Sequence, residues 1–345
     1  MTGAEARYPS GATDRQPVLG LDIGGTKLAA AVVTAGGSAH GVAVEPTRRE
    51  EGWPAVVERL FALGRRAIAG AGLDGVRAVG IACGGPLDAV TGLLLDPPNL
   101  PGWTRVPIGP MAAEAFGVPT ALRNDASAAA LAEYRFGAGQ GADTMLYLTI
   151  STGIGGGFVL GGALHAGAAG NGGEFGHITV RGGERRCLCG RLGCVEAYAS
   201  GTSIAVRARE LLARPDACSS LAELPVVTAA DVSAAAAAGD PLARSVWEGT
   251  VDALGSAVTD LVNAFEPDVV VLGGGVTRSG ARLLDPVRDL VAREAMPPAA
   301  EAARIVLAGL GDLVGVVGAG TVAHDLLNGT GLAPVRSTSR KETHV

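Results

Sequence analysis

LGLDIGGTKLAAAVV, at residues 19–33, sets the pattern from which the architecture of this chain follows. It consists of a strand-like apolar run, a glycine-rich turn that carries a hydroxyl residue, and a second apolar run. LYLTISTGIGGGFVL, at residues 146–160, repeats that organisation. Two such hairpins predict two related domains that face one another. The alternative is a chance echo within a sequence that is rich in alanine and glycine.

The rest of the chain alternates between short apolar runs and longer helical periodicity, which is typical of an α/β protein. Strands are expected at 18–23, 28–33, 76–82, 145–150, 157–160, 268–272 and 304–308. Helices are expected at 52–71, 110–116, 126–135, 196–213, 241–265 and 281–294, with a last helix near 313–328.

Composition excludes several classes of protein. Glycine accounts for 53 of 345 residues, about twice the usual share of about 7%, which indicates tight turns and close backbone approaches. The net charge of −6 and the absence of a basic patch argue against nucleic acid as a partner. No apolar run reaches the roughly 18–20 residues of a membrane span, and the N-terminus lacks the apolar segment of a secretory signal. Three of the five cysteines lie within 187–194, which favours a metal site in a reducing cytoplasm.

The turn of the first hairpin has the residue types of a phosphate site. No Walker A motif occurs, and the turn is followed by a strand rather than by the helix of a Rossmann site. Glycines at such a bend can aim backbone N–H groups at phosphate oxygens, and Asp22 beside it suits Mg²⁺. An ordinary hairpin is the alternative.

Three further features favour a nucleotide in an interdomain cleft. The turn at 151–157 could close over the same phosphates, and the glycine cluster within 269–276 follows a buried strand. Lys27, in the first hairpin, is one of only two lysines in the chain.

His177, Cys187, Cys189 and Cys194 supply one imidazole and three thiolates, the ligand count of a closed structural zinc site. Buried free cysteines are the alternative. Because four protein ligands leave no position open for water, this zinc is expected to organise the site and not to react.

Carboxylates flank this cluster, and another lies at a predicted helix start. Glu174 and Glu196 could accept hydrogen bonds from sugar hydroxyls, or they could be solvated surface residues. Asp125 could accept a proton from an attacking hydroxyl. The alternative is that Asn124 or Asp125 only caps the helix that follows.

Taken together, these motifs resemble the ROK family of sugar kinases, within the actin/hexokinase/heat-shock-70 ATPase superfamily. The resemblance rests on DIGGTK (22–27), PPNLPGW (97–103), NDASAAALAEYRFGAG (124–139), STGIGGG (151–157), GEFGH (173–177) and CLCGRLGCVEAYASG (187–201), and it covers about residues 18–328. Arg123, Ser127 and Ser151 differ from the residues most common at these positions of the glucokinase motifs. None of these differences removes a proposed catalytic group.

The resemblance implies a role for each motif. Asp125 would be the general base for the sugar's C6 hydroxyl, and His177 would hold the sugar while it ligates zinc through its other nitrogen. The remaining sugar-binding residues would be Asn99, Asn124, Glu174 and Glu196, together with Asp125 itself. Mg²⁺ and ATP would be held by Asp22, Gly24, Gly25, Thr26, Lys27, Thr152, Gly153, Gly155 and Gly156, with Gly274 and Gly275 near the adenosine.

The resemblance also implies the domain plan. Two actin-like ATPase (ribonuclease H-like) domains would flank the cleft, one formed by 18–122 plus 312–330 and a larger one by 123–311 with the zinc motif. Residues 1–17 and 331–345 would be flexible tails. The expected protein is a cytoplasmic homodimer or homotetramer.

The expected activity is transfer of the ATP γ-phosphoryl group to a hexose, glucose first. An N-acetylmannosamine or N-acetylglucosamine kinase is the second interpretation, and a fructokinase is a lesser one. A non-catalytic sugar sensor or repressor is disfavoured because Asp22 and Asp125 are both present. The first hairpin also begins too early to leave room for the additional N-terminal DNA-binding region of repressors.

Overall fold

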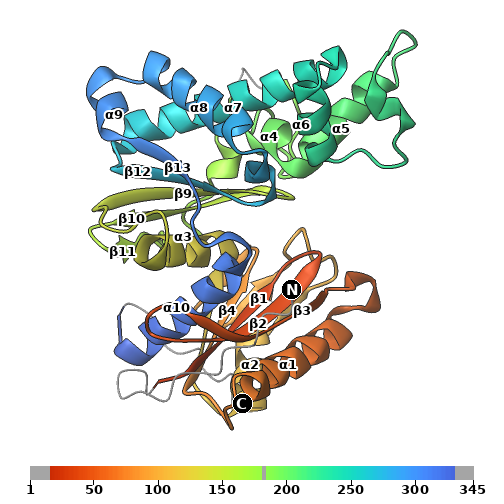
Figure 1. The fold of residues 1–345 in the computed structure, drawn as a ribbon. Helices are drawn as coiled ribbons and strands as arrows, with labels where there is room; N and C mark the ends of the chain where they lie inside the picture. Colours follow the sequence, from red (N-terminus) through yellow and green to blue (C-terminus); the bar gives the residue numbers. More distant parts are fainter. Residues whose placement is uncertain (1–15, 181–183, 331–345) are drawn as a thin grey trace, which may run out of the picture. The chain divides into compact units, whose positions relative to one another are not determined.

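The computed structural model describes residues 16–180 and 184–330, and the chain divides into two compact units (Figure 1). The first unit contains the described residues up to Phe136, the segment Ala166–Gly172, and the residues from Asp312 onward. The second unit contains Gly137–His165 and Gly173–Gly311. Apart from residues 16 and 17, the predicted tails lie outside the described residues.

The first unit is built on a five-stranded sheet with the order β3-β2-β1-β4-β8. The strands are β1 (Val18–Ile23), β2 (Lys27–Val33), β3 (Ala39–Pro46), β4 (Ala78–Cys83) and β8 (Thr120–Asn124). β1, β4 and β8 run parallel, whereas β2 is antiparallel to both β1 and β3. A small sheet of β5 (Leu87–Asp88), β6 (Leu93–Leu95) and β7 (Thr104–Val106) follows β4.

Helices cover both faces of this first sheet (Figure 1). α1 (Trp53–Gly70) and α2 (Ile108–Phe116) lie on the face where Leu19 and Leu21 pack. α10 (Val314–Asn328) lies on the other face, with α3 (Asp125–Phe136) beside it. α10 approaches the sheet so closely that a Cβ at Gly80 would be 1.8 Å from the Ala319 carbonyl oxygen. Glycine in the strand is therefore what allows the C-terminal helix to pack on the N-terminal sheet.

The second unit repeats the strand order of the first. Its sheet runs β11-β10-β9-β12-β13, with β9, β12 and β13 parallel and β10 antiparallel to both β9 and β11. The strands are β9 (Thr144–Ile150), β10 (Ile154–Leu160), β11 (Ala163–Leu164), β12 (Val269–Gly273) and β13 (Arg304–Leu307). The helices are α4 (Glu196–Ala199), α5 (Gly201–Leu212), α6 (Ala229–Ala237), α7 (Pro241–Phe265), α8 (Ala281–Glu294) and α9 (Pro297–Ala302). Apolar side chains of β9, β12 and α7 form its core.

The mixed α/β class predicted from the sequence is confirmed. One predicted helix, 196–213, is wrong, because it is two helices separated at Ser200. The backbone of Ser200 is extended (ψ 155°), and its side chain caps α5 by accepting a hydrogen bond from the Ser203 N–H. None of the described helices combines the length and the apolar character that a membrane crossing requires.

The compact units differ from the predicted domain plan after residue 122. β8 and α3 belong to the first unit, although the sequence division assigned residues from 123 onward to the second. The reason is packing: β8 pairs with β4, and a Cβ at Gly318 of α10 would be 2.6 Å from the Ala128 carbonyl of α3. The segment Ala166–Gly172 also belongs to the first unit.

Candidate active site

In the first unit, the carboxyl ends of three parallel strands gather acidic and amide side chains. Asp22 of β1 lies opposite Ala82 of β4, and Asn124 of β8 lies opposite Cys83. Asp125 follows directly as the first residue of α3. The edge of a parallel sheet at which strands end is where α/β proteins bind ligands. Two carboxylates that are over 100 residues apart in sequence are thus brought to one edge.

Asn124 is the residue that caps α3. Its Oδ1 accepts hydrogen bonds from the N–H groups of Ala126 (3.0 Å) and Ser127 (3.1 Å). The Asp125 Oδ1 accepts from the adjacent Ala126 N–H at 2.8 Å, and the carboxylate also interacts with the N–H of its own residue. The capping alternative therefore holds for Asn124, and it leaves the Asp125 carboxylate with acceptor capacity for a ligand.

Burial, and to a smaller extent the nearby Asp125 carboxylate, raise the pKa of Asp22 to about 7, against the opposing charge of Lys27. Burial also raises the pKa of Asp125, while hydrogen bonds from the Ala126 and Asp125 N–H groups work against that rise. The pKa of the buried Cys83 thiol is likewise raised, by burial and then by the two aspartates. Ionising both aspartates at this edge is therefore unfavourable unless a cation compensates their charge. Such an arrangement suits the binding of a divalent cation or the uptake of a proton.

The turn of the first hairpin is held in place by neighbours. A Cβ at Gly25 would lie 3.1 Å from the Asn99 carbonyl oxygen and 3.2 Å from the Asn99 Cβ, so the two residues are in contact. Thr47 is fully buried, and its hydroxyl donates to the Gly24 carbonyl at 2.7 Å. Thr26 and Lys27 are exposed at the tip. The structure therefore brings the predicted phosphate turn and the predicted sugar residue Asn99 together.

In the second unit, the corresponding hairpin borders a cavity of about 450 Å³. Thr152, from the β9–β10 turn, and Gly275, which follows β12, both line it. Gly274 has a φ of 88° and packs against the backbone of Ile150, where a Cβ would lie 2.5 Å from the carbonyl oxygen. Gly274 therefore shapes the cavity from behind, and Gly275 forms its wall.

The other predicted glycines of this hairpin have packing contacts. Space for a Cβ is blocked by Glu196 at Gly153 and by Phe175 at Gly156. Gly155 lies in β10, opposite Thr149. Through these contacts, Phe175 and Glu196 pack against the hairpin. Both lie in the part of the chain that carries the predicted metal ligands and the predicted sugar residues Glu174 and Glu196.

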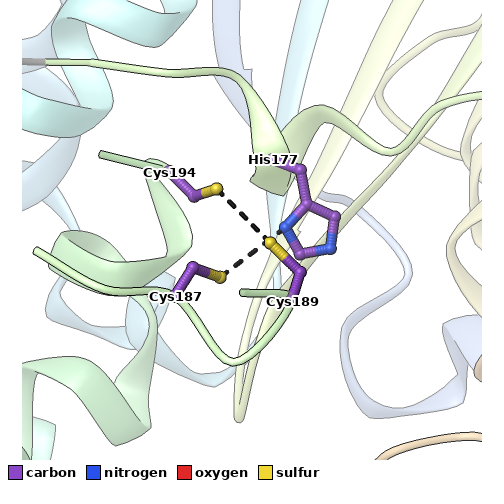
Figure 2. A group of neighbouring side chains, drawn as sticks. All are labelled: His177, Cys187, Cys189 and Cys194. Atoms are coloured by element: carbon purple, nitrogen blue, oxygen red, sulfur yellow. Dashed lines mark hydrogen bonds between the residues drawn. The ribbon is translucent and has the colours of Figure 1, made fainter. Parts of the chain in front are cut away.

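The four predicted metal ligands lie together in the second unit (Figure 2). One ligand atom from each of His177, Cys187, Cys189 and Cys194 lies within 4.8 Å of the others. The His177 Nδ1 is 3.7 Å from the Cys187 Sγ, and the Sγ atoms of Cys189 and Cys194 are also 3.7 Å apart. Without a cation, burial raises the pKa of the Cys187 thiol to about 12. A soft dication would hold these thiols as thiolates, and three sulfurs with one imidazole fit zinc.

Two glutamates adjoin the cluster on different sides. The Glu174 Oε2 is 3.9 Å from the His177 Nε2, the imidazole nitrogen that faces away from Cys187. The Glu196 Oε2 accepts from the Ile154 N–H at 2.8 Å, and its Oε1 is 3.6 Å from the Cys187 Sγ. Glu196 therefore connects the hairpin to the cysteine cluster, while the Glu174 side chain is half-exposed beside His177.

Residues 18–326 match the sequence profile of the ROK family. The chain belongs to the ROK family. Relatives of this family that resemble it include the glucokinase of Halalkalibacterium halodurans, which is 35% identical over 88% of this chain and 93% of its own length.

Two other ROK relatives bear on the substrate. The N-acetylmannosamine kinase of Escherichia coli O1:K1 is 35% identical over 75% of this chain and 82% of its own length. The solved ROK glucokinase of Streptomyces griseus, in complex with glucose and AMPPNP, is 35% identical, with a TM-score of 0.76. That alignment covers 90% of this chain and 99% of the solved one.

Sequence reasoning missed residues that support the site from a distance. Asn171 accepts from the Leu87 N–H (3.3 Å) and donates to the Leu87 carbonyl (3.1 Å), which holds its segment against the loop after β4. Thr47 holds the hairpin bend, and Ser233 of α6 lines the cavity. The sequence shows that these residues are polar but not what they contact, because their partners lie far away along the chain.

Proposed function

We propose that this protein is an ATP-dependent hexose kinase that converts glucose to glucose 6-phosphate. The observation that carries the proposal is the placement of Asp125 beside Asp22 at the carboxyl ends of the parallel strands, with the capping of α3 left to Asn124. Family membership and the glucokinase relatives support the choice of reaction.

Asp125 is the proposed general base. Its carboxylate would accept the proton of the C6 hydroxyl as that oxygen attacks the γ-phosphorus of ATP, and ADP would leave. The raised pKa of Asp125 supports this role, because a base is most effective when its pKa approaches the working pH. Base catalysis of this kind contributes about 10²–10⁴-fold to the rate.

Asp22 and the first hairpin are proposed to receive the phosphates and their cation. Asp22 offers a carboxylate to Mg²⁺, which when bound neutralises charge on the phosphate oxygens. Gly24, Gly25, Thr26 and Lys27 offer backbone N–H groups, a hydroxyl and a positive charge. The contact between Gly25 and Asn99 supports a phosphoryl group and a sugar hydroxyl meeting at this edge.

The second unit is proposed to hold the nucleotide and to share in holding the sugar. Thr152 and Gly275 line a cavity whose volume lies in the range of small-molecule sites. His177, Cys187, Cys189 and Cys194 would hold zinc, which when bound fixes the loop. Glu174 and the His177 Nε2, which lie 3.9 Å apart, would then contact ring hydroxyls.

All five cysteines are free thiols, which suits the expected reducing cytoplasm. A homodimer or homotetramer stays a prediction.

The test is a coupled ADP-release assay with Mg-ATP that compares kcat/KM for glucose, N-acetylmannosamine, N-acetylglucosamine, fructose and allose. We expect glucose to be preferred by about 100-fold, which equals about 2.7 kcal/mol of differential transition-state binding. Preference for an acetylated sugar would favour the second candidate function, which the N-acetylmannosamine kinase relative supports. No ADP release with any sugar would overturn the kinase proposal.

A further inference from the structure

Ser233 is a buried hydroxyl without a partner in the wall of the second unit's cavity. It lies on α6, its side chain is 2% exposed, and its residue lines the same cavity as Thr152 and Gly275. Among the residues that the structure describes, nothing forms a hydrogen bond with its Oγ. Buried polar groups in folded proteins nearly always have a partner, so such a hydroxyl in a cavity wall points to a ligand.

Two other hydroxyls of the cavity, those of the exposed Thr228 and the half-buried Ser279, are already used by the protein. Thr228 donates to the Asp231 carboxylate and accepts from the Asp231 N–H, in the capping box of α6. The Ser279 Oγ donates to the Val276 carbonyl at 2.8 Å. A serine within a helix commonly bonds the carbonyl four residues earlier, but Ser233 does not do so. Among the described residues, Ser233 therefore carries the one fully buried hydroxyl that lines the cavity, and that hydroxyl has no partner within the protein.

The surroundings of Ser233 indicate which part of a nucleotide it would meet. Ala205, Val227, Ala230 and Val276 contribute apolar wall, which suits the flat face of a nucleobase and offers nothing to a phosphate. The groups of the cavity that suit phosphates are those of the β9–β10 turn and the guanidinium groups of Arg278 and Arg282. Ser233 lies elsewhere, on α6, one helical turn after Ala229 and Ala230, which also line the cavity. A hydroxyl can donate to a ring nitrogen and accept from an exocyclic amine, both of which adenine presents.

We propose that Ser233 reads the nucleobase of the phosphoryl donor by a hydrogen bond from inside the cavity. The inference rests on the proposed function, because it assigns ATP to this cavity. Because the Oγ of Ser233 is fully buried, the proposal requires a rotation about χ1 that turns the hydroxyl toward a bound base. Ser233 then contributes to nucleotide affinity and to the choice of base, and it takes no part in the chemical step.

The test compares Ser233→Ala with Thr259→Val in the coupled assay. Thr259, on α7, is a matched control: it is buried, its Oγ1 has no partner among the described residues, and it does not line the cavity. We expect Ser233→Ala to raise the KM for ATP about 3–10-fold, the value of one hydrogen bond. The kcat and the KM for glucose should stay within about twofold, and Thr259→Val should leave all three constants unchanged.

A second readout separates base reading from a loss of packing. Inosine triphosphate replaces the 6-amino group of ATP with an oxygen, so Ser233→Ala should change the ratio of kcat/KM for the two nucleotides. An unchanged ratio, or an equal rise of the ATP KM in both variants, would overturn the inference.

If the proposed kinase function is wrong, the kinetic assay gives a different result. In that case the wild-type protein would release no ADP with any sugar, and calorimetric titration with a non-hydrolysable ATP analogue would replace the kinetic assay. Equal affinity of the wild-type and Ser233→Ala proteins for that analogue would overturn the inference by itself, and weaker binding by Ser233→Ala alone would support it.

Discussion

The two units have the same sheet order but carry different chemistry at the same place. In the first, the parallel strands β1, β4 and β8 end at Ile23, Cys83 and Asn124, with Asp22 one residue before the end of β1 and Asp125 directly after β8. In the second, β9 and β12 end in a hydroxyl-bearing turn and a run of glycines. One edge is acidic enough to raise the pKa of Asp22 to about 7, by burial and the Asp125 charge, and the other borders a cavity.

This difference shows that topology fixes where a site lies, and that a few side chains fix what it does. An edge with paired carboxylates can take up protons and cations, whereas an edge of glycines and hydroxyls can bind phosphates without charge of its own. The second unit adds a cysteine cluster that the first lacks among its described residues. The account therefore assigns proton transfer to the first unit and nucleotide binding to the second.

Removing the metal cluster is expected to have the largest effect on the second unit. The purified protein should contain one zinc per chain by elemental analysis, and Cys189→Ser should lose it. The kcat/KM for glucose should fall by at least about 10³-fold, because the binding energy of a structural zinc is folding energy for its loop. Cys218→Ser is the control, since Cys218 is also exposed but lies outside the cluster. A zinc-free protein with full activity would refute this assignment.

A larger side chain at Gly25, in the turn of the first hairpin, tests whether the position of this turn matters for catalysis without changing any charge. Gly25→Val should push Asn99 away, because even a Cβ at Gly25 would lie 3.1 Å from the Asn99 carbonyl oxygen. We expect kcat/KM to fall by about 10–10²-fold, as small displacements of positioning groups do. Gly75→Ala is the control, because nothing lies within 4 Å of a Cβ there. Similar kinetics for both variants would argue that the hairpin has no part in catalysis.

The raised pKa of Asp22 predicts a smaller, pH-dependent effect on stability. The native state keeps the Asp22 proton up to a pH of about 7, whereas the unfolded state loses it near the ordinary value of 3.8. Wild-type stability should therefore fall relative to that of Asp22→Asn as the pH rises from 4 to 8 without Mg²⁺ or nucleotide. The difference is at most about 4 kcal/mol, at about 1.4 kcal/mol per pKa unit.

The opposite pH dependence is expected at Asp88: the stability of the wild type relative to Asp88→Asn should rise with pH. A hydrogen bond from the Thr91 hydroxyl lowers the pKa of Asp88, so this carboxylate stabilises the fold above its ordinary pKa. Chemical denaturation of the three proteins measures both trends, the Asp22 trend between pH 4 and 8 and the Asp88 trend between pH 5 and 3. Parallel pH curves for wild type and Asp22→Asn would contradict the proposed burial of charge at Asp22.

Elements with strong apolar runs could be predicted from the sequence. Helices 241–265 and 281–294 and strand 18–23 have the predicted bounds. β3 was not predicted, because it is an edge strand whose residues alternate between exposed and partly buried positions. The helix predicted at 196–213 is divided by the cap at Ser200, which apolar periodicity does not reveal.

The grouping of His177 with the three cysteines could be predicted from residue types and spacing, since these four residues lie close together in the chain. The pairing of Asp22 with Asp125 could not be derived from spacing, and it entered through the family resemblance. Support from Thr47, Asn171 and Ser233 depends on partners that only the folded chain brings near. An isolated polar residue in a sequence does not indicate which distant residue it will contact.

The central claim is that Asp125 is the base and that Asn124 does the capping. The most direct measurement is kcat for glucose phosphorylation by Asp125→Asn beside Asp240→Asn. Asp240 also begins a helix, but hydrogen bonds from Ala243, Ser219 and Ser220 outweigh its partial burial and lower its pKa to about 2, as expected of a structural cap. The account predicts a loss of at least about 10²-fold for Asp125→Asn with an intact fold, and nearly normal turnover for Asp240→Asn. Wild-type turnover by Asp125→Asn would contradict it.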